Sequence, residues 1–372
     1  MRLLYDARHV VHPYTGLARY SASLLDALLR TRERNDFEVE VLCAREADLR
    51  GNPHYENLQE HVARARCRIH FEPTPAITLA QHWHVSRTVR RLAPDAYFYP
   101  HFDPPLGVNV PTTFVVHDLI PLKVAGYVQR FEGLKKVYFS SMIRLAMRKA
   151  RCCVAVSQTT RRDLIDLLGQ GSSNRITVAY EGPVLDESDG QDTGPPLPKI
   201  DGRYLLYVGD RRPHKNLPRL LDLFDALRRR AGFTGSLVLA GSTTNFDVDI
   251  DRRIAGRGDV IVLGNVTDAA LARLYRAADA LVMLSAYEGF GLPVVEAARF
   301  GTRMILSDGG ALAEIAPAGA CRIPLTMNVD EAALRVEAYL SESGKVDLSL
   351  PAAFSWEAAA RSIFPEAYLG SA

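Results

Sequence analysis

Short apolar runs recur along the chain, and each has the composition of a strand that is buried on both faces of a sheet. Most are followed by a turn and then by apolar residues at helical spacing, such as Leu24, Leu25, Leu28 and Leu29. Strands that alternate with helices form parallel, doubly wound sheets. The pattern therefore predicts an α/β protein whose strands are residues 2–6, 38–43, 95–100, 112–117, 152–157, 175–182, 204–209, 236–241, 260–264, 280–284 and 303–307. Residues 45–90 are assigned only to loops and helices.

This alternation runs in two blocks. Residues 186–198 between them are polar, contain Gly and Pro and show no periodicity, which is typical of a linker between domains. A chain of 372 residues is also long enough for two domains of ordinary size. We therefore predict a first domain at 1–185, a linker at 186–199, a second domain at 200–350 and a terminal segment at 351–372 that contains a helix.

Composition and charge narrow the class of protein. The net charge is only +2, but residues 1–186 carry +6 and the remainder −4. A basic first half can bind phosphates or an anionic membrane. A chance asymmetry of charge is the alternative. No nucleic-acid partner is expected. The five cysteines are scattered without zinc-ligand spacing, no run of 18 apolar residues occurs, and the N-terminus lacks the apolar segment of a signal peptide. We therefore expect a cytoplasmic protein.

One stretch in the second half combines an anion site with two carboxylates. The apolar run at 280–284 predicts a strand, the glycines of Gly-Phe-Gly-Leu-Pro293 break it, and the proline suits the first turn of a helix. Backbone N–H groups at the start of such a helix can bind anions. Glu288 and Glu296 lie beside them, which favours a ligand that carries hydroxyls near its phosphates, such as a sugar nucleotide.

The segment Glu288-Gly-Phe-Gly-Leu-Pro, followed by Glu296, resembles the EX7E motif of retaining glycosyltransferases with the GT-B fold. It is most similar to family 4, which includes many bacterial mannosyltransferases. The alternative is an ordinary strand–helix turn with solvated glutamates. The resemblance implies two Rossmann-like domains that face each other across a cleft, the first binding the acceptor and the second the nucleotide sugar. It also implies that the terminal helix crosses back to the first domain.

Two segments of the first half extend the resemblance. Thr15-Gly16-Leu-Ala-Arg-Tyr resembles the family's Thr-Gly-Ile-Gly-Arg-Tyr, but Leu and Ala replace the Ile and the second Gly, so only Gly16 is carried over. His117-Asp-Leu-Ile-Pro lies at the carboxyl end of a predicted strand, where α/β sheets bind ligands. It resembles the family's His-Asp-Leu-x-Pro, whose histidine contacts the donor sugar or its phosphate. A histidine packed at a strand end is the alternative.

Breaking a sugar–diphosphate bond leaves negative charge on the departing phosphate, and a cation has to stabilise it. Arg211, Arg212 and Lys215 follow a glycine at a predicted strand end, in a segment that resembles the family's Gly-x-x-x-Pro-x-Lys-Asn. We favour Arg211 over Arg212 as the partner of Lys215, and a solvated basic turn is the alternative. The triplet Asp247-Val-Asp249 has the spacing of a metal-binding Asp-x-Asp, but its polar surroundings predict a surface loop. No metal and no cofactor are therefore expected.

The resemblance also assigns roles to individual residues. It implies that Glu288 binds hydroxyls of the donor sugar, that Glu296 binds those of the ribose, and that the segment at Val266 reads the base. The implied set is catalytic His117, Lys215 and Glu288; nucleotide- or diphosphate-binding Gly16, Arg211, Arg212, Lys215, Val266, Leu271, Leu292 and Glu296; and sugar-binding Glu288, Gly289, Phe290 and Gly291.

The expected activity is a retaining transfer of a sugar from a nucleotide to a glycan or lipid-linked glycan, in surface polysaccharide or O-antigen assembly. Likeness to bacterial mannosyltransferases favours GDP-mannose, and other GDP-, UDP- or dTDP-sugars remain open. Retention would follow if the acceptor attacks the face that the phosphate leaves and a phosphate oxygen takes the proton. A sugar-nucleotide epimerase, a phosphorylase or a non-catalytic nucleotide-sugar-binding protein are the alternatives. The presence of Lys215, Glu288 and Glu296 together argues against the last.

Residues 123–151 carry eight Lys or Arg and one acid, Glu132. Apolar residues, among them Val137, Tyr138 and Leu145, interleave with the basic ones. A basic amphipathic helix can lie on anionic lipid, which would give a peripheral contact with the inner face of the membrane. A solvated helix face that packs its other side on the sheet explains the pattern equally well, and both readings stay open.

Overall fold

The structure is a computed structural model of the 372-residue chain. It describes residues 1–11, 15–31, 37–49, 53–65, 67–125, 127, 132–185, 198, 200–243, 248–344 and 346–364. The predicted linker at 186–199 lies outside these residues except at 198.

The chain divides into two compact units. Unit 1 comprises Met1–Leu119, Gly133–Gly182 and Ala352–Ala372, and unit 2 comprises Ile120–Glu132 and Pro183–Pro351. The sequence assigned the whole of 1–185 to the first domain, whereas the structure groups Ile120–Glu132 with unit 2.

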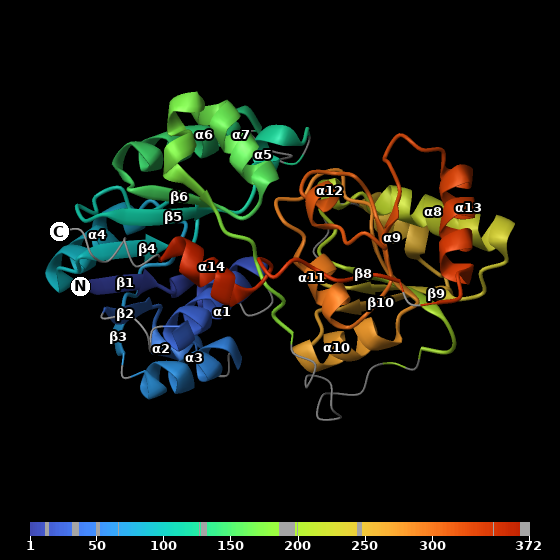
Figure 1. The fold of residues 1–372 in the computed structure, drawn as a ribbon, viewed down its shortest axis with the longest axis horizontal. Helices are drawn as coiled ribbons and strands as arrows, with labels where there is room; N and C mark the ends of the chain where they lie inside the picture. The colour runs from blue at the N-terminus through green and yellow to red at the C-terminus, as the bar shows by residue number, and fades with distance from the viewer. Residues whose placement is uncertain are drawn as a thin grey trace. The chain divides into compact units, whose positions relative to one another are not determined.

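Unit 1 is built on a seven-stranded parallel sheet, in the order β3-β2-β1-β4-β5-β6-β7 (Figure 1). Its strands are β1 (Arg2–Asp6), β2 (Glu38–Cys43), β3 (Arg68–Phe71), β4 (Ala96–Tyr99), β5 (Thr112–Val116), β6 (Cys152–Ala155) and β7 (Ile176–Val178). The prediction that residues 45–90 hold only loops and helices was wrong at β3. This strand pairs only with β2, and its residues are partly exposed, so it lacks the apolar run of a central strand.

The helices of unit 1 alternate with these strands along the chain, except α14, which follows unit 2. They are η1 (Arg8–Val11), α1 (Gly16–Thr31), α2 (Glu46–Leu49), α3 (Pro53–Arg64), α4 (Gln81–Leu92), α6 (Glu132–Lys149), α7 (Gln158–Leu168), η3 (Gln170–Arg175) and α14 (Trp356–Ile363). Ser157 caps α7 by accepting a hydrogen bond from Thr160 N, and Ser355 caps α14 in the same way through Ala358 N. In Figure 1, α14 lies beside α1, and the two helices pack together within unit 1.

Unit 2 is built on a second parallel sheet of six strands, in the order β10-β9-β8-β11-β12-β13. Its strands are β8 (Tyr204–Val208), β9 (Ser236–Ala240), β10 (Val260–Gly264), β11 (Ala280–Met283), β12 (Met304–Leu306) and β13 (Cys321–Arg322). Its helices are α5 (Ile120–Lys123), η4 (Pro213–Lys215), α8 (Leu217–Ala231), α9 (Val248–Ile254), α10 (Asp268–Ala277), α11 (Leu292–Arg299), α12 (Leu312–Ile315) and α13 (Val329–Ser341). Helices α8 and α13 lie side by side, and their inner faces join the core of the sheet.

Each sheet reverses its strand order at one point, and this fixes where ligands are expected. In unit 1 the reversal falls between β1 and β4, and in unit 2 between β8 and β11. Open α/β sheets bind ligands beyond the carboxyl ends of the strands at such a switch point. The loops that follow these four strands are therefore the places to look for functional side chains.

Candidate active site

The loops after β8 and β11 are joined by hydrogen bonds at the switch point of unit 2. The Asn216 side chain donates to Leu284 O at 3.1 Å, and Ala286 N donates to His214 O at 2.7 Å. Asn216 has a left-handed backbone (φ 55°), which asparagine tolerates better than most residues. These contacts bring the two segments that the sequence singled out, around Lys215 and Glu288, to one place.

Lys215 and Glu288 form an ion pair there. Lys215 Nζ lies 2.8 Å from Glu288 Oε1 and 3.1 Å from Oε2. Both side chains are largely buried. Burial alone would raise the pKa of Glu288, but the charge of Lys215, with His214 and Ser285, outweighs it and lowers the pKa. The site therefore holds a carboxylate and an ammonium side by side, which suits a ligand with both hydroxyl and phosphate groups.

His214, next to this pair, is a neutral neighbour. Its side chain is buried, and burial together with the charge of Lys215 lowers its pKa to about 4. Its Nδ1 is buried and has no hydrogen-bond partner among the residues that the structure describes. At neutral pH the cationic charge of η4 therefore comes from Lys215 and not from His214.

The turn between β11 and α11 is shaped by glycine. Gly291 precedes the first residue of α11 with φ 116°, and a Cβ there would lie 2.9 Å from Ile315 Cδ1. Gly310 has φ 60°, and its Cβ would lie 2.5 Å from the backbone oxygen of Glu288. Both positions need glycine because L side chains rarely adopt these angles and have no space here. Pro293, in the first turn of α11, starts the helix as the sequence predicts.

Glu296, on α11, is almost fully buried, and Tyr275 donates a hydrogen bond to its Oε2 at 2.9 Å. Tyr275 is a residue of α10 that the sequence did not single out. Its partner lies 21 positions away, so only the fold brings the two together. Among the other residues implied by the resemblance, Leu271 and Phe290 are buried, and Val266 is half-buried near the end of β10.

The structure gives the two candidate arginines different surroundings. The Arg211 side chain is only 7% exposed and pairs with Asp251 of α9. The Arg212 side chain is 43% exposed and pairs with Asp210 at 3.0 Å, while its Nη1 donates to the hydroxyl of Tyr127 at 2.7 Å. These contacts favour Arg212 as the arginine that is accessible to a ligand, whereas the sequence favoured Arg211.

The segment that contains Tyr127 belongs to unit 2 through these contacts. Besides accepting from Arg212, the ring of Tyr127 lies 5.4 Å from that of His214. These contacts agree with the grouping of Ile120–Glu132 with unit 2, although this segment follows a strand of unit 1.

Part of the Asp-x-Asp triplet lies in a helix, which differs from the prediction. Asp249 lies in the first turn of α9, exposed and paired with Arg252 at 3.1 Å, so the surface-loop assignment was wrong for this residue. Asp247 lies outside the described residues. Within the described part of the chain, no group of three or more His, Cys, Asp or Glu could hold a metal ion.

Two predicted residues lie in unit 1. Gly16 begins α1, and a Cβ there would meet no atom within 4 Å, so the space above it is open. His117, after β5, donates from Nε2 to Pro100 O at 2.9 Å and has Nδ1 3.6 Å from Glu181. Burial would lower the pKa of His117, but Glu181, Pro100 O and Asp118 together outweigh it and raise the pKa. Glu181 is a partner that the sequence did not indicate.

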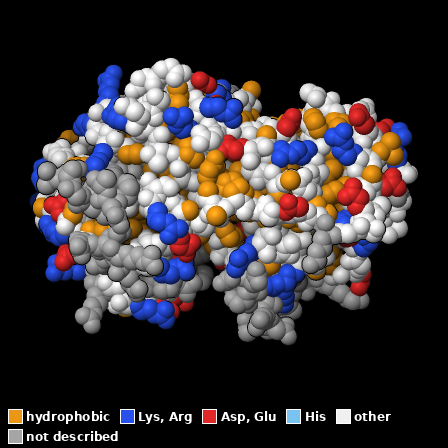
Figure 2. Space-filling model, viewed as in Figure 1, with side chains coloured by type: hydrophobic (Ala, Val, Ile, Leu, Met, Phe, Trp, Pro, Cys, Tyr) orange, Lys and Arg blue, Asp and Glu red, His pale blue; other side chains and the backbone are white. Residues whose placement is uncertain are grey.

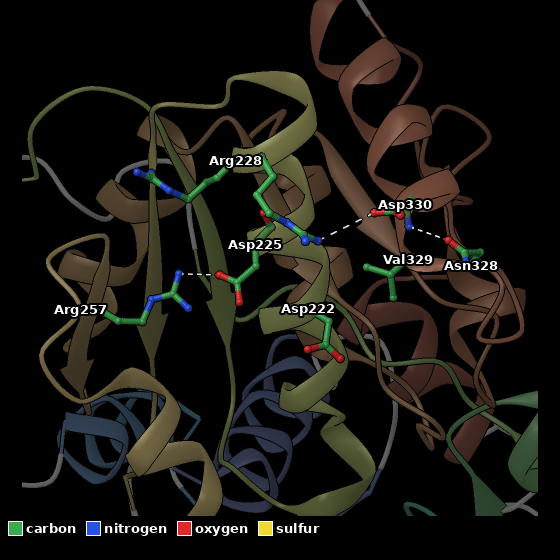
Figure 3. A pocket seen from close by; sticks show the side chains of 8 residues that line it. Asp222, Asp225, Arg228, Arg257, Asn328, Val329 and Asp330 are labelled. Carbon is green, nitrogen blue, oxygen red and sulfur yellow. Dashed lines mark hydrogen bonds and ion pairs between the residues drawn. The ribbon is translucent and has the colours of Figure 1, made fainter.

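A surface pocket of about 740 Å³ lies elsewhere in unit 2, between α8 and α13 (Figure 3). Its charged side chains already pair with one another or with neighbours: Arg257 with Asp225 at 2.7 Å and Arg229 with Asp330 at 3.9 Å. None of the residues implied by the sequence lines this pocket. Its size therefore carries no functional assignment.

Two doubly wound sheets, with a Lys–Glu pair beside a glycine turn at the switch point of the second, match what is expected of a GT-B glycosyltransferase. The chain belongs to this family of enzymes: residues 14–187 match the family model Glycosyltransferase Family 4, and residues 194–358 match Glycosyl transferases group 1. The predicted family, the two-sheet fold and the enzyme class are thus confirmed.

Similar proteins include several mannosyltransferases. O-antigen chain mannosyltransferase B of Escherichia coli is 25% identical over 335 residues, which cover 85% of this chain and 84% of that protein. GDP-mannose:cellobiosyl-diphosphopolyprenol alpha-mannosyltransferase of Komagataeibacter xylinus is 28% identical over 194 residues, about half of each chain. The fold is similar to that of HepE of Anabaena in complex with UDP and glucose, with a TM-score of 0.64, 18% identity and coverage of 99% and 97%. Among the described helices, none is both long and apolar enough to cross a membrane.

Proposed function

We propose that this glycosyltransferase moves mannose from GDP-mannose to a glycan acceptor with retention of the anomeric configuration. The observation that carries the proposal is the buried pair of Lys215 and Glu288 at the carboxyl ends of β8 and β11. A lysine at this point supplies charge for a diphosphate, and a glutamate accepts hydrogen bonds from sugar hydroxyls. A sugar nucleotide carries both groups on adjacent atoms.

In the proposed reaction the bond between C1 of the sugar and the diphosphate oxygen breaks. The acceptor oxygen forms its new bond to C1 on the same face, and its hydroxyl proton passes to an oxygen of the departing diphosphate. Lys215, with Arg212 in the accessible position, would stabilise the charge that develops on that diphosphate. From the family resemblance we assign His117 as a ligand of the donor sugar or its phosphate. We assign Glu296 as a ligand of the ribose. No covalent intermediate and no metal are part of this scheme.

The choice of mannose and GDP rests on the relatives. The two described above are named as mannosyltransferases, and one name specifies GDP-mannose as donor and a diphosphopolyprenol-linked sugar as acceptor. The Anabaena structure, which holds UDP and glucose, keeps a UDP-sugar as the second candidate donor. By analogy we propose a lipid-linked acceptor in surface polysaccharide assembly.

An acceptor on a lipid requires contact with a membrane, and α6 offers a surface for it. Leu134 and Val137 are 69% and 63% exposed, and Tyr138 and Leu145 are exposed as well. The exposed Lys135, Arg144, Arg148 and Lys149 accompany them. On the face shown in Figure 2, Lys and Arg outnumber Asp and Glu over unit 1, while both signs mix over unit 2. We propose that α6 docks on anionic lipid, since apolar side chains flanked by cations match such a surface.

A donor panel tests the function. The purified protein is incubated with GDP-mannose, UDP-glucose, UDP-galactose and dTDP-rhamnose, with and without octyl α-mannoside, and release of the nucleoside diphosphate is measured. We expect release from GDP-mannose, its loss in Lys215→Ala, and an α-linked product by NMR. If only UDP-glucose were turned over, UDP-glucose would replace GDP-mannose as the proposed donor. Nucleotide binding without turnover of any donor would favour the non-catalytic reading.

A further inference from the structure

Three histidines lie beyond the carboxyl ends of neighbouring strands in unit 1. His9 follows β1, His101 follows β4 and His117 follows β5, and these three strands are adjacent in the sheet. The rings of His9 and His101 lie 5.4 Å apart. The proposed function uses only His117, so the pair at the switch point of this sheet has no role yet.

His101 is held in one orientation by a buried carboxylate. Its Nδ1 bonds to Asp103 Oδ1, and the Asp103 side chain is fully buried while that of His101 is 16% exposed. Asp103 is itself fixed, because Gln81 donates to its Oδ2 and to its backbone oxygen, each at 3.0 Å. Tyr99 in turn donates to Gln81 Oε1 at 3.0 Å. Because a carboxylate oxygen accepts, His101 Nδ1 donates this hydrogen bond, and Nε2 on the other side of the ring is left for another partner.

Nε2 of His101 makes no hydrogen bond among the described residues, and neither does Nε2 of His9, which is buried. The residue before His9, Arg8, forms a fully buried ion pair with Asp6 at 2.8 Å. A buried nitrogen without a partner costs free energy in a folded protein unless a ligand or water satisfies it. The buried Nε2 of His9, beside the partly exposed ring of His101, therefore indicates a place where a ligand binds.

The charges around the two rings favour a neutral ligand with hydroxyls over an anion. Burial, with the neighbouring His101 and Arg8, lowers the pKa of His9, so this ring is neutral at pH 7. The carboxylate of Asp103 beside His101 would repel a phosphate. Imidazole nitrogens can form hydrogen bonds with hydroxyls, and neighbouring hydroxyls on a pyranose ring can reach the nitrogens of two adjacent rings together.

The segment that carries His101 also lies against the helix proposed to meet the membrane. Phe102 packs on Phe139 of α6, with ring centroids 4.3 Å apart, and Lys149 of α6 donates to Leu106 O at 2.6 Å. Burial and the charge of Asp103 raise the pKa of Tyr138, which places this exposed side chain of α6 near the same carboxylate. A sugar at His101 thus lies close to a surface suited to a lipid.

We propose that His101 and His9 bind hydroxyls of the acceptor sugar, and that Asp103 acts as a positioning residue that holds His101. This assignment rests on the proposed glycosyl transfer, because it supplies the site for the second substrate of that reaction.

The test separates acceptor binding from donor chemistry. Octyl α-mannoside is the probe, and its KM is measured at saturating donor, while donor hydrolysis is measured without acceptor. We expect His101→Gln to raise the acceptor KM about tenfold or more through the lost hydrogen bond. Hydrolysis of the donor should stay within about twofold, because the Lys215–Glu288 pair is untouched. Asp103→Asn should also raise the acceptor KM, but by less than His101→Gln does. The imidazole remains in this variant but loses the carboxylate that orients it.

A second readout needs no donor at all. Octyl mannoside, glucoside and galactoside are titrated into the full chain while the imidazole C–H signals are followed by NMR. We expect shifts at His9 and His101 and none at His84, an exposed histidine of α4 whose change to Gln serves as the matched control. If no octyl glycoside shifts these signals, or if His101→Gln leaves the acceptor KM unchanged, the assignment is wrong. If no donor reacted, the proposed function would be contradicted instead. The NMR titration would then decide alone whether His9 and His101 bind a sugar.

Discussion

The ion pair between Lys215 and Glu288 is the residue-scale feature on which the proposed chemistry depends. Both side chains are largely buried, so each depends on the other for compensation of its charge. If Lys215 binds the diphosphate as proposed, the diphosphate would compete with Glu288 for it, and sugar hydroxyls would then bind the freed carboxylate oxygens. On this proposal the pair would keep both side chains charged before the donor binds.

Replacing the two glutamates should have different effects. Glu288→Ala is expected to lower the turnover number for donor hydrolysis about 100-fold or more, because the carboxylate would contact the reacting sugar. Glu296→Ala is expected to weaken nucleoside diphosphate binding about tenfold with a smaller change in turnover, because ribose contacts are the same in the ground and transition states. Turnover and calorimetric GDP affinity measure these effects. Equal losses of GDP affinity in both variants would contradict the assignment.

The raised pKa of His117 predicts a pH dependence of donor binding. If protonated His117 contacts the donor phosphate, the donor KM rises as the pH increases through this pKa. Glu181→Gln removes the main group that raises the pKa, so the rise in KM should move to lower pH. Donor KM from pH 6 to 9 measures this, and Glu60→Gln, at an exposed pair with Arg64, is the control. If Glu181→Gln did not move the pH profile of the donor KM, protonated His117 would be ruled out as a donor ligand.

The same shift has a consequence for stability. A histidine whose pKa is raised by folding stabilises the fold at pH values below its ordinary pKa of about 6.5, and this contribution is lost as the pH rises through the raised value. In Glu181→Gln the difference in unfolding free energy between pH 6 and pH 9 should therefore be smaller than in the wild type.

At this scale the sequence indicated single residues but not their partners. Lys215, Glu288 and Glu296 stood out because they lie at predicted strand ends or helix starts. The contacts of Arg211 with Asp251, Glu296 with Tyr275 and His117 with Glu181 join distant parts of the chain, so no local pattern reveals them. His101-Phe-Asp103 could have been found, because it follows a predicted strand as His117 does.

At the scale of elements, the turn before α11 shows how backbone geometry sets the site. Gly291→Ala should lower the free energy of unfolding by about 1–3 kcal/mol, because its φ of 116° strains any L side chain and Ile315 occupies the space. Gly258→Ala, where a Cβ meets no atom within 4 Å, is the control. Urea titration measures both, and donor hydrolysis should fall only in the first variant. If Gly291→Ala left the free energy of unfolding unchanged, the turn would be able to accommodate a side chain at this position.

Helix α6 carries the prediction about membranes. Leu134→Glu with Val137→Glu should reduce binding to vesicles that contain anionic lipid, because it removes apolar contact and adds like charge to the lipid surface. Each Lys or Arg near such a surface contributes about 1 kcal/mol, so wild-type binding should also fall steeply with salt. Vesicle co-sedimentation is the measurement, and Leu334→Glu, at an exposed position of α13, is the control. If the wild-type protein did not bind anionic vesicles at low salt, docking of α6 on anionic lipid would be excluded.

The elements were largely predictable because each strand of a parallel sheet is a short apolar run, and glycine or proline separates it from the next helix. The exceptions are instructive. β3 at the sheet edge is partly exposed, and β13 has two residues, so neither has an apolar run to detect. The faces of α6 were also hidden: Met142 and Ala146 are buried, while Val137 and Leu145 on the other side are exposed, although all four are apolar.

For the whole molecule, the proposed chemistry predicts independence from metal ions. If Lys215 and an arginine supply the charge for the departing diphosphate, donor hydrolysis by the full chain should keep its rate in EDTA. The rate is measured before and after chelation and again after adding Mn²⁺ or Mg²⁺. Loss of the rate with EDTA and its return with either ion would contradict this scheme and return attention to Asp247 and Asp249.

The packing of α14 against α1 has a consequence for synthesis. Thr31 ends α1 and Trp356 begins α14, so the two partners leave the ribosome at opposite ends of translation. The stretch Pro183–Pro351 of unit 2 has emerged by the time α14 appears, and domains generally fold as their segments emerge. Until then the apolar face of α1 lacks the Trp356 ring that packs on Tyr20. A nascent chain stalled before Trp356 would thus expose apolar side chains of α1 that α14 covers in the folded protein.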